Sequence, residues 1–407
     1  MNNTTITLNT SQQKVFEDAI NWWRTKSYQT FEISGPPGSG KTFLINKIIQ
    51  ALNIDVRRIA PMAYTGSAAI NMRTKGMSMA KTIFSWLYDF KKEIVLDKNG
   101  NPVLDPVFQT PKTKIIFIPK KSLDNIDLII VDEAGTVPVD MRRVIDSMNI
   151  PVIAAGDLDQ LPPIFGTSGY LNNVNSIHFL NEIMRQASNN TIIQFSQMAI
   201  KGIDIPLGRH GNVDVIYEDQ LTDEMIANSD ILICSKNSTR DHYISHIRHD
   251  MLNFHGTLPS HGERLVCRKN NWNIESGGIS LTNGLLGSCI NSPDLTCFNF
   301  KDKTFKMCFR PDLAYNSVFE NINVDYYYLN GNKEQRDAIK DKLYSKGDKF
   351  EYGYAITTHM SQGSEFRNGI YIEEFLNKNI NRNLNYVGLT RFREHCIYVK
   401  RRPKKYW

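Results

Sequence analysis

Short apolar runs alternate with helical periodicity along most of the chain. Residues 126–131 and 151–155 are almost continuously apolar and of strand length, which is typical of parallel strands covered on both faces. Apolar positions recur at helical spacing over 43–52. The same alternation starts again at 230–235 and at 352–357. The pattern predicts an α/β protein with two parallel-sheet domains, since 407 residues are too many for one ordinary core.

Two stretches interrupt this alternation and predict insertions. Residues 88–122 hold β-like segments around Asn99-Gly100, a pair that favours a tight hairpin turn. Residues 255–348 hold several short β-like pieces and predict a small β-rich insertion. The expected division is a first domain of 1–87 and 123–180 with a hairpin insertion at 88–122, and a second domain of 181–254 and 349–407 with a β-rich insertion at 255–348. The hairpin is either a plain surface feature or a device with a mechanical role.

A glycine-rich turn between a β-prone run and the helix at 43–52 matches the phosphate-binding loop in spacing and context. Backbone N–H groups of such a loop surround a phosphate at the positive end of a helix. Lys41 would contact the β- and γ-phosphates of ATP, and the Thr42 hydroxyl would bind Mg²⁺. The amide of Gln12 can both donate to and accept from an adenine edge. The candidate nucleotide-binding residues here are Gln12, Gly35, Pro36, Pro37, Gly38, Ser39, Gly40, Lys41 and Thr42.

An acidic pair follows the apolar run at 126–131, at the end of a strand where open α/β sheets bind ligands. Asp132 can hold the Mg²⁺, and Glu133 can polarise the attacking water. Gln160, after the next predicted strand, can sense the γ-phosphate. Arg185 and Arg391 are the arginines that the second half can bring to the same site. These candidate catalytic residues predict an ATPase whose site is divided between the two domains.

Composition and charge narrow the class of protein. The 48 Lys and Arg against 42 Asp and Glu leave +6, a mild basic excess that suits a polyanionic partner. The six cysteines include no CxxC pair, which indicates reduced thiols. No apolar run reaches the length of about 18 residues that a membrane helix needs, and the first residues lack the basic region of a signal peptide. We therefore expect a cytoplasmic protein with no membrane partner.

Small, hydroxyl and aromatic side chains suggest where a nucleic acid would bind. Residues 61–69 are small enough for a phosphate backbone to approach closely, and residues 80–87 offer aromatic rings for bases to stack on. Ordinary packing is the alternative for each stretch. The candidate nucleic-acid contacts are Pro61, Thr65, Thr82, Phe84, Trp86, Asn99, Asn237, Thr358 and His359.

Taken in order, these residues resemble the motifs of superfamily 1 helicases, specifically those of the RecD/Dda-like 1B branch. The matching positions are Gln12, Gly35–Thr42, Ala60-Pro61, Asp132-Glu133, 156–163, Arg185-Gln186, 358–363 and 386–391. The chain departs from the family pattern at Gly135, where serine is common, and at Met360, where lysine is usual. The first departure weakens a hydroxyl coupling contact, and the second removes a cation that would touch DNA or phosphate.

The resemblance implies two RecA-like motor domains with ATP in the cleft between them. It also implies single-stranded DNA that crosses both domains, and translocation along it from 5′ to 3′. It also implies tailed duplex DNA as the substrate, the hairpin as a strand-separating pin, and Gly363 beside the nucleotide. Replication or recombination proteins are then candidate partners. The compact insertions resemble phage-encoded members, which would place the protein in the cytoplasm of a host cell.

Two other functions stay open on the residues alone. One is a nucleic-acid-stimulated ATPase that acts on RNA or remodels protein–DNA complexes without unwinding. The other is a non-catalytic nucleotide-binding clamp or loader, which would have no need for the complete hydrolytic set.

Overall fold

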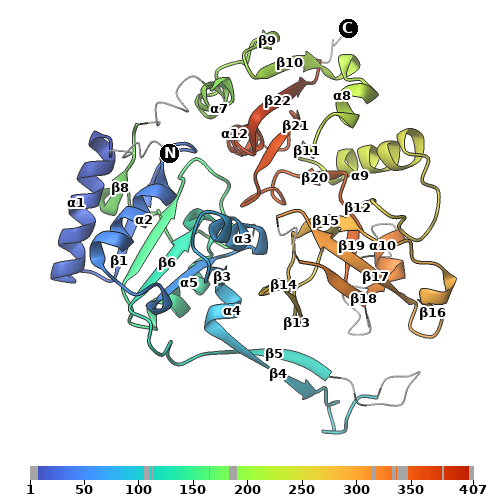
Figure 1. Ribbon diagram of the computed structural model, residues 1–407, viewed down its shortest axis with the longest axis horizontal. Coiled ribbons are helices and arrows are strands. Elements are labelled where there is room, and N and C mark those ends of the chain that lie inside the picture. The colour runs from blue at the N-terminus through green and yellow to red at the C-terminus, as the bar shows by residue number, and fades with distance from the viewer. Residues whose placement is uncertain are drawn as a thin grey trace, which may run out of the picture.

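The computed structural model describes residues 8–104, 111, 113–164, 166–182, 190–313, 317–331, 336, 347–377 and 380–402. It contains two parallel-sheet domains, a β-rich insertion and a long two-stranded ribbon (Figure 1). Within those ranges no helix is long and apolar enough to cross a bilayer. The predicted fold class, two RecA-like motor domains that each carry an insertion, is confirmed.

The first motor domain is built on a six-stranded parallel sheet in the order β3-β2-β6-β7-β1-β8. Strand residues alternate between its faces: Ile130 and Ile153 pack under α1–α3, whereas Ile129 and Val152 pack under α4 and α5. Both faces are covered, which explains the nearly continuous apolar runs of the sequence. The elements are α1 (Thr10–Thr25), β1 (Thr30–Ser34), α2 (Lys41–Leu52), β2 (Ile59–Ala63), α3 (Gly66–Thr74), β3 (Lys81–Thr82), α4 (Ile83–Leu87), β6 (Leu128–Asp132), α5 (Val139–Asp146), β7 (Val152–Gly156) and β8 (Ile177–Phe179).

The second motor domain has a six-stranded sheet in the order β20-β11-β21-β22-β10-β9, parallel except where β9 meets β10. Helices α7 and α12 cover one face, and α8 and α9 cover the other. The elements are α7 (Thr191–Lys201), β9 (Gly208–His210), β10 (Val213–Tyr217), α8 (Asp223–Ala227), β11 (Leu232–Cys234), α9 (Asn237–Ser245), β20 (Ala355–Thr357), β21 (Phe366–Ile372), α12 (Asn381–Leu389) and β22 (Phe392–Lys400).

The β-rich insertion forms an antiparallel sheet in the order β16-β17-β15-β12-β19, with β18 on β17 and a separate β13–β14 hairpin. Strand β19 pairs with β12 in this sheet, and the second motor sheet resumes at β20, although the expected second-domain segment 349–407 includes β19. The elements are β12 (Arg264–Cys267), β13 (Asn271–Ser276), β14 (Ile279–Leu281), β15 (Leu286–Cys289), β16 (Phe298–Asn299), β17 (Thr304–Pro311), β18 (Phe319–Asp325), α10 (Tyr326–Asn330) and β19 (Phe350–Tyr352).

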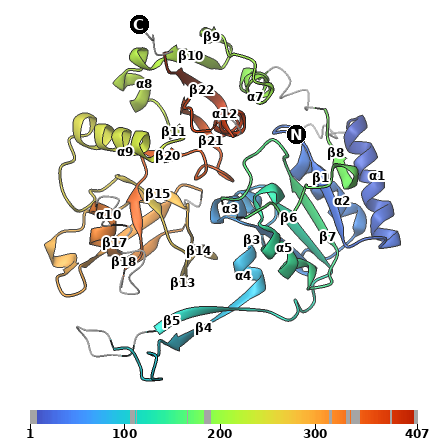
Figure 2. The ribbon, with the colours of Figure 1, turned by 180° about the vertical axis from the view of Figure 1, so that it is seen from behind.

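The hairpin insertion is a ribbon of β4 (Tyr88–Ile94) and β5 (Thr113–Pro119) that projects from the first motor domain (Figure 2). The Asn99-Gly100 turn closes a smaller hairpin beyond β4, where Leu96 pairs with Pro102. Its turn is held by Asp97, whose Oδ1 accepts hydrogen bonds from the backbone N–H groups of Asn99 (2.8 Å) and Asn101 (2.9 Å). The long pairing partner of β4 is therefore β5: Ile94 pairs with Thr113, nine residues (113 − 104) further along the chain than the register of the Asn99-Gly100 turn would give.

Helix α3 of the first motor domain touches both the insertion and the second motor domain. Its Ser67 Oγ donates to Gly284 O at 3.1 Å, and its Arg73 Nη1 donates to Gly278 O at 2.6 Å. Just beyond the helix, Lys75 Nζ pairs with Glu365 Oε1 at 2.5 Å. Residues 67–75 thus connect the first motor domain to both the β-rich insertion and the second motor domain.

Candidate nucleotide site between the motor domains

The phosphate-binding loop connects β1 to α2 at the carboxyl end of the first sheet. Gly38 and Gly40 take positive φ angles of 78° and 81°, which glycine adopts without a Cβ clash. The first N–H groups of α2 have no partner within the helix and face the loop. Lys41 Nζ donates to the loop carbonyls of Gly35 (2.6 Å) and Pro36 (3.2 Å). The lysine therefore lies over the loop that would hold the phosphates.

Gln12 supports this loop from the first helix. The residue is 1% exposed, and its Nε2 donates to Ser39 O at 2.8 Å. Its Oε1 accepts from Asn9 N at 3.1 Å, while the Asn9 side chain caps the same helix in return. In this arrangement both ends of the amide bond to the protein. Recognition of an adenine edge by Gln12 stays a prediction.

The acidic pair lies at the end of β6, close to the loop lysine. Burial raises the pKa of Asp132 above its ordinary value, the neighbouring Glu133 carboxylate raises it further, and Lys75 and Lys41 act in the opposite direction. Glu133 has a φ of 51°, a left-handed conformation that is uncommon outside glycine. Its backbone N–H donates to Asp132 Oδ1 at 3.0 Å, which helps to hold this turn. Strained backbone of this kind is concentrated at functional sites.

The loop of residues 157–161, which follows β7, forms the third side of the site. β7 lies between β6 and β1 in the sheet, so the ends of these three strands meet. Burial raises the pKa of Asp157 to about 6, and the nearby Lys41 charge opposes that rise. Gln160 is 8% exposed and follows Asp157 in a turn, in which its N–H donates to Asp157 O at 3.3 Å.

Three side chains of the second motor domain hold the 157–161 loop. Tyr386 Oη donates to Asp157 Oδ2 at 2.6 Å, Asn383 Nδ2 donates to Asp159 O at 2.9 Å, and Gln362 Nε2 donates to Leu161 O at 3.0 Å. Leu161 also packs against Leu384, Tyr386 and Val387. We call this set of contacts the motor-domain clamp. It joins the nucleotide side of the first domain to α12 and the 358–363 loop of the second.

Arg391 is buried next to the motor-domain clamp, with 4% of its surface exposed. Its guanidinium donates to Val387 O (3.2 Å), Ser364 O (3.3 Å) and Thr390 Oγ1 (3.3 Å). Burial and the Asp157 carboxylate raise the pKa of Tyr386, and the Arg391 charge opposes that rise. The arginine thus lies beside the side chain that touches the 157–161 loop. The other candidate, Arg185, lies outside the described residues.

The residues of this site fit a nucleotide with its divalent cation. Ser39 Oγ and Gln160 Oε1 are buried and have no hydrogen-bond partner in the described part of the chain. Buried polar atoms of this kind normally have a partner, so both atoms can bond to a ligand. The Thr42 hydroxyl and the Asp132 carboxylate are oxygen ligands of the type that Mg²⁺ prefers. The donor set therefore suits Mg²⁺ and a phosphate chain.

Gly363, expected beside the nucleotide, packs against helix α3. A Cβ at this position would lie 2.7 Å from Ala68 Cβ and 2.9 Å from Thr65 Oγ1. The residue therefore sits at the contact between the motor domains, and a direct nucleotide contact by it stays a prediction.

The candidate nucleic-acid contacts fall into different environments. Pro61 and Thr358 are buried, and the Thr358 hydroxyl donates to Cys234 O at 3.1 Å. Asn99 and Asn237 are exposed. DNA contact at every one of these positions stays a prediction.

The other candidates include capping residues and half-buried rings. Thr65 and Thr82 cap α3 and α4 with their hydroxyl oxygens. Trp86 is half-buried and its Nε1 donates to Pro61 O at 2.8 Å, whereas half-buried Phe84 lines a cavity. Burial lowers the pKa of half-buried His359, which favours its neutral form.

Sequence analysis did not find the residues that join the two motor domains. Asn383, Tyr386 and Gln362 lie more than 200 positions from the loop atoms that they contact. Tyr386 lies inside a recognised motif, but nothing in its spacing indicates a bond to Asp157. The Lys75–Glu365 pair, 290 positions apart, is likewise visible only in the structure.

One family model and two curated proteins are similar in sequence to this chain. A family model described as an AAA domain matches residues 7–213. An uncharacterized protein of Methanocaldococcus jannaschii is 24% identical over 435 residues, which cover 90% of this chain and 36% of that protein. The ATP-dependent DNA helicase Pif1 of Campylobacter jejuni is 29% identical over 146 residues, which cover 34% of this chain and 30% of that protein. The chain spans roughly a third of the length of these two relatives.

Solved structures of Pif1 helicases share the fold. A structure of two coordinating Pif1 helicases that act on forked double-stranded DNA gives a TM-score of 0.55 at 19% identity, over 97% of this chain and 92% of that chain. Pif1 from Bacteroides, in complex with ADP-AlF3 and single-stranded DNA, gives 0.52 at 18% identity over the same shares. With its family match over residues 7–213, this chain belongs to the AAA-domain family, and its two motor domains have the fold of the Pif1 helicases.

Proposed function

We propose that this protein is an ATP-dependent DNA helicase of superfamily 1B that moves 5′ to 3′ on single-stranded DNA. The motor-domain clamp is the observation that carries the proposal. Through Asp157, Asp159 and Leu161 it ties the loop at the nucleotide side of the first domain to the second domain. Binding or hydrolysis of ATP at the phosphate loop can therefore act on the second motor domain through these contacts.

The proposed roles follow from the position of each side chain. Lys41 leaves the loop carbonyls to hold the phosphates, and Thr42 and Asp132 hold Mg²⁺. The cation, when bound, offsets the negative charge of the phosphates. Glu133 orients and polarises the attacking water. Arg391, once released from its present hydrogen-bond partners, stabilises the charge that develops on the transferred phosphoryl group.

The substrate of the proposed activity is single-stranded DNA that continues into a duplex. The mild positive charge of +6 supports a polyanionic partner. The C. jejuni Pif1 helicase, which is similar over 146 residues, is named as an ATP-dependent DNA helicase. Proteins of replication or recombination are the partners with which such an activity would work, in the cytoplasm.

An unwinding assay with tailed duplexes tests this proposal. We expect single-stranded DNA to stimulate ATP hydrolysis, and we expect a 5′-tailed duplex to be opened and a 3′-tailed one to remain intact. Affinity for the single strand should fall with salt, by about −0.7 in the log–log slope for each neutralised phosphate. Opening of only the 3′-tailed duplex would overturn the polarity. Stimulation by RNA alone would favour the RNA-directed ATPase, and absence of any nucleic-acid effect would refute both.

The β4–β5 ribbon is proposed to act as the strand-separating pin, and its tip can be tested alone. Replacing Asp97–Pro102 with a Gly-Ser link removes the turn held by Asp97, so the tip loses its stiffness. We expect DNA-stimulated ATP hydrolysis to stay nearly intact while duplex separation falls sharply. A matched control is the turn between β16 and β17, where Asn299 Oδ1 accepts from Lys301 N and Asp302 N. Unwinding that survives the first replacement as well as the second would exclude the tip from strand separation.

A further inference from the structure

The ion pair between Lys75 and Glu365 crosses the boundary between the two motor domains close to the nucleotide site. Lys75 Nζ lies 2.5 Å from Glu365 Oε1, and both side chains are partly exposed, Lys75 by 37% and Glu365 by 29%. Burial and the Glu133 charge raise the pKa of Asp132, the proposed Mg²⁺ ligand, and the charge of Lys75 opposes that rise. Lys75 therefore acts on the nucleotide site, although none of the recognised sequence motifs includes it.

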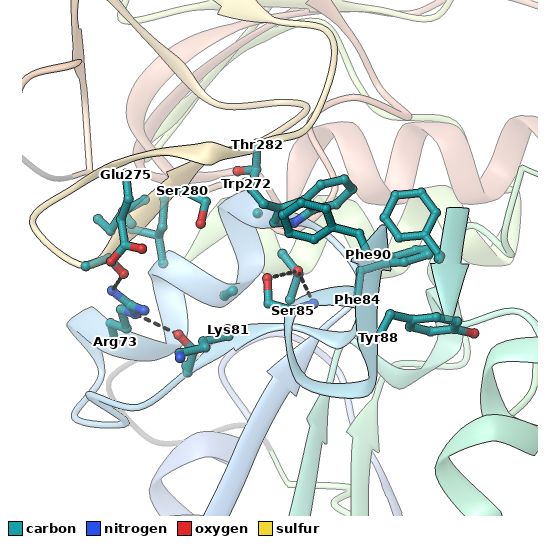
Figure 3. Close-up of a pocket in the computed structure, with 18 of the residues that line it drawn as sticks. Arg73, Lys81, Phe84, Ser85, Tyr88, Phe90, Trp272, Glu275, Ser280 and Thr282 are labelled. Carbon is teal, nitrogen blue, oxygen red and sulfur yellow. Dashed lines mark hydrogen bonds between the residues drawn. The ribbon is translucent and has the colours of Figure 1, made fainter. Parts of the chain in front are cut away.

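The backbone of Lys75 is held within the first motor domain. Its carbonyl accepts from Asn46 Nδ2 at 3.3 Å, and Asn46 lies on helix α2, which follows the phosphate loop. Two positions earlier, Arg73 donates to Ala80 O and to Gly278 O, each at 2.6 Å (Figure 3). The backbone of Lys75 is thus well anchored, and its long side chain is the part that can change partner.

Glu365 belongs to the second motor domain and lies against Arg391. The residues on either side of it contact the arginine: Ser364 O accepts from Arg391 Nη1 at 3.3 Å, and Phe366 N donates to Arg391 O at 2.8 Å. Burial raises the pKa of the Glu365 carboxyl, but the charge and hydrogen bond of Lys75 and the charge of Arg391 lower it below its ordinary value. Glu365 also lines a cavity of about 730 Å³, which leaves its side chain room to reorient.

The buried guanidinium of Arg391 has no carboxylate partner among the described residues, and its hydrogen bonds go to neutral oxygens. A buried charge without an ionic partner is costly, and a carboxylate is a stronger acceptor than a neutral oxygen. Glu365 is the carboxylate whose two chain neighbours contact Arg391, but it bonds to Lys75. Lys75 thus occupies the acceptor that Arg391 would otherwise attract.

We propose that Lys75 is a positioning residue that keeps Arg391 available to the nucleotide. By holding Glu365, it prevents an Arg391–Glu365 ion pair that would retain the arginine within the second motor domain. Because Lys75 comes from the first motor domain, this hold exists only while the two domains are in contact. When they separate, Glu365 captures Arg391 and hydrolysis stops. The inference rests on the proposed function, in which Arg391 stabilises the charge on the transferred phosphoryl group.

Steady-state ATP hydrolysis by the full chain, with saturating single-stranded DNA, tests this role in three variants. In Lys75→Ala, Glu365 is released to bind Arg391, and kcat should fall by about 10-fold to 150-fold, the range for one hydrogen bond to a charged group. KM for ATP should change much less than kcat, because Lys75 acts through Arg391. Glu365→Gln removes the competing charge and should keep kcat within about threefold of wild type. The double variant Lys75→Ala/Glu365→Gln should recover to the same level, although Lys75 is still absent.

The double variant separates this role from two others. If the ion pair only holds the domains together, both single variants and the double variant should lose turnover to a similar extent. If Lys75 contacts the phosphates directly, Lys75→Ala and the double variant should be equally slow while Glu365→Gln stays normal. Either result would overturn the proposal, as would normal kcat in Lys75→Ala. Lys400→Ala is the matched control, since it breaks a pair of the same length, 2.5 Å to Asp204, within the second motor domain, and should keep the wild-type rate.

An Arg391→Ala background distinguishes failure of this inference from failure of the proposed function. There, adding Lys75→Ala should cause no further loss of turnover, because no arginine is left for Glu365 to capture. If DNA stimulates the wild type and Arg391→Ala is slow, but the double variant is not recovered, the helicase proposal stands and the role of Lys75 is wrong. If Arg391→Ala keeps the wild-type rate, the roles of Arg391 and Lys75 both fall. Thermal unfolding of each variant identifies any loss that comes from misfolding.

Discussion

Arg391→Ala is expected to reduce ATP turnover by about 10³-fold to 10⁵-fold, the usual cost of losing an arginine finger. The guanidinium lies beside Tyr386, and its hydrogen bonds go to neutral oxygens of Val387, Ser364 and Thr390. Hydrogen bonds to neutral groups are weaker than those to a charged phosphate. We therefore expect nucleotide binding to draw the arginine from these oxygens to the phosphates. Nucleotide affinity should fall much less than the rate.

Arg393 provides the matched control, since it is an exposed arginine that lies in β22, two positions after Arg391. Arg393→Ala should turn over ATP at the wild-type rate. Steady-state hydrolysis with saturating single-stranded DNA gives the comparison, and the unfolding midpoint of each variant reports its folding. An Arg391→Ala protein that is folded and within threefold of wild type would show that another group supplies the positive charge.

Glu133→Gln should lower turnover by about 10²-fold to 10⁴-fold while ATP still binds, because proton transfer by a positioned carboxylate contributes an effect of that size. The substitution keeps the side-chain length and leaves the backbone contacts of the turn in place. Among these, Glu133 O accepts from Thr136 N at 2.9 Å and from Thr136 Oγ1 at 2.8 Å. The expected loss is therefore chemical and not structural.

Single-turnover hydrolysis and a separate nucleotide-binding measurement distinguish the two steps for Glu133→Gln. Glu394→Gln, an exposed glutamate on the second motor domain, makes the same chemical change away from the site. It should leave both measurements unaltered. Near-normal hydrolysis by Glu133→Gln would assign the activation of water to a different residue.

The sequence was most informative where local chemistry determines the structure. The spacing of Gly35, Gly40 and Lys41 indicates a phosphate loop, and in the structure Gly38 and Gly40 take the positive φ angles that glycine adopts most easily. The apolar run that ends at Asp132 indicates a buried strand, and the acid pair after it had to lie at the sheet edge. These elements depend on residues that are close together in the sequence, so the sequence alone predicts them.

Pairings between distant segments could not be predicted in the same way. The Asn99-Gly100 pair correctly indicates a turn, but the partner of β4 is β5, and nothing local to β4 specifies which strand it will meet. The short β19 shows the same limit, since its membership of the insertion sheet depends on β12. The rings of Phe84 and Trp272 lie 6.4 Å apart between centroids, although 188 positions (272 − 84) separate the two residues in the chain. No sequence motif indicates this contact.

The bond between Tyr386 and Asp157 stabilises the contact between the two motor domains. Separating the domains would strip a buried phenol and a buried carboxylate of each other and admit water to both. A hydrogen bond to a charged group contributes about 1.5–3 kcal/mol, equivalent to a preference of roughly 10-fold to 150-fold for the joined state. The bond therefore favours contact between the 157–161 loop and α12. In the proposed helicase, ATP binding and hydrolysis would then change the strength of an existing contact and would not have to create it anew in each cycle.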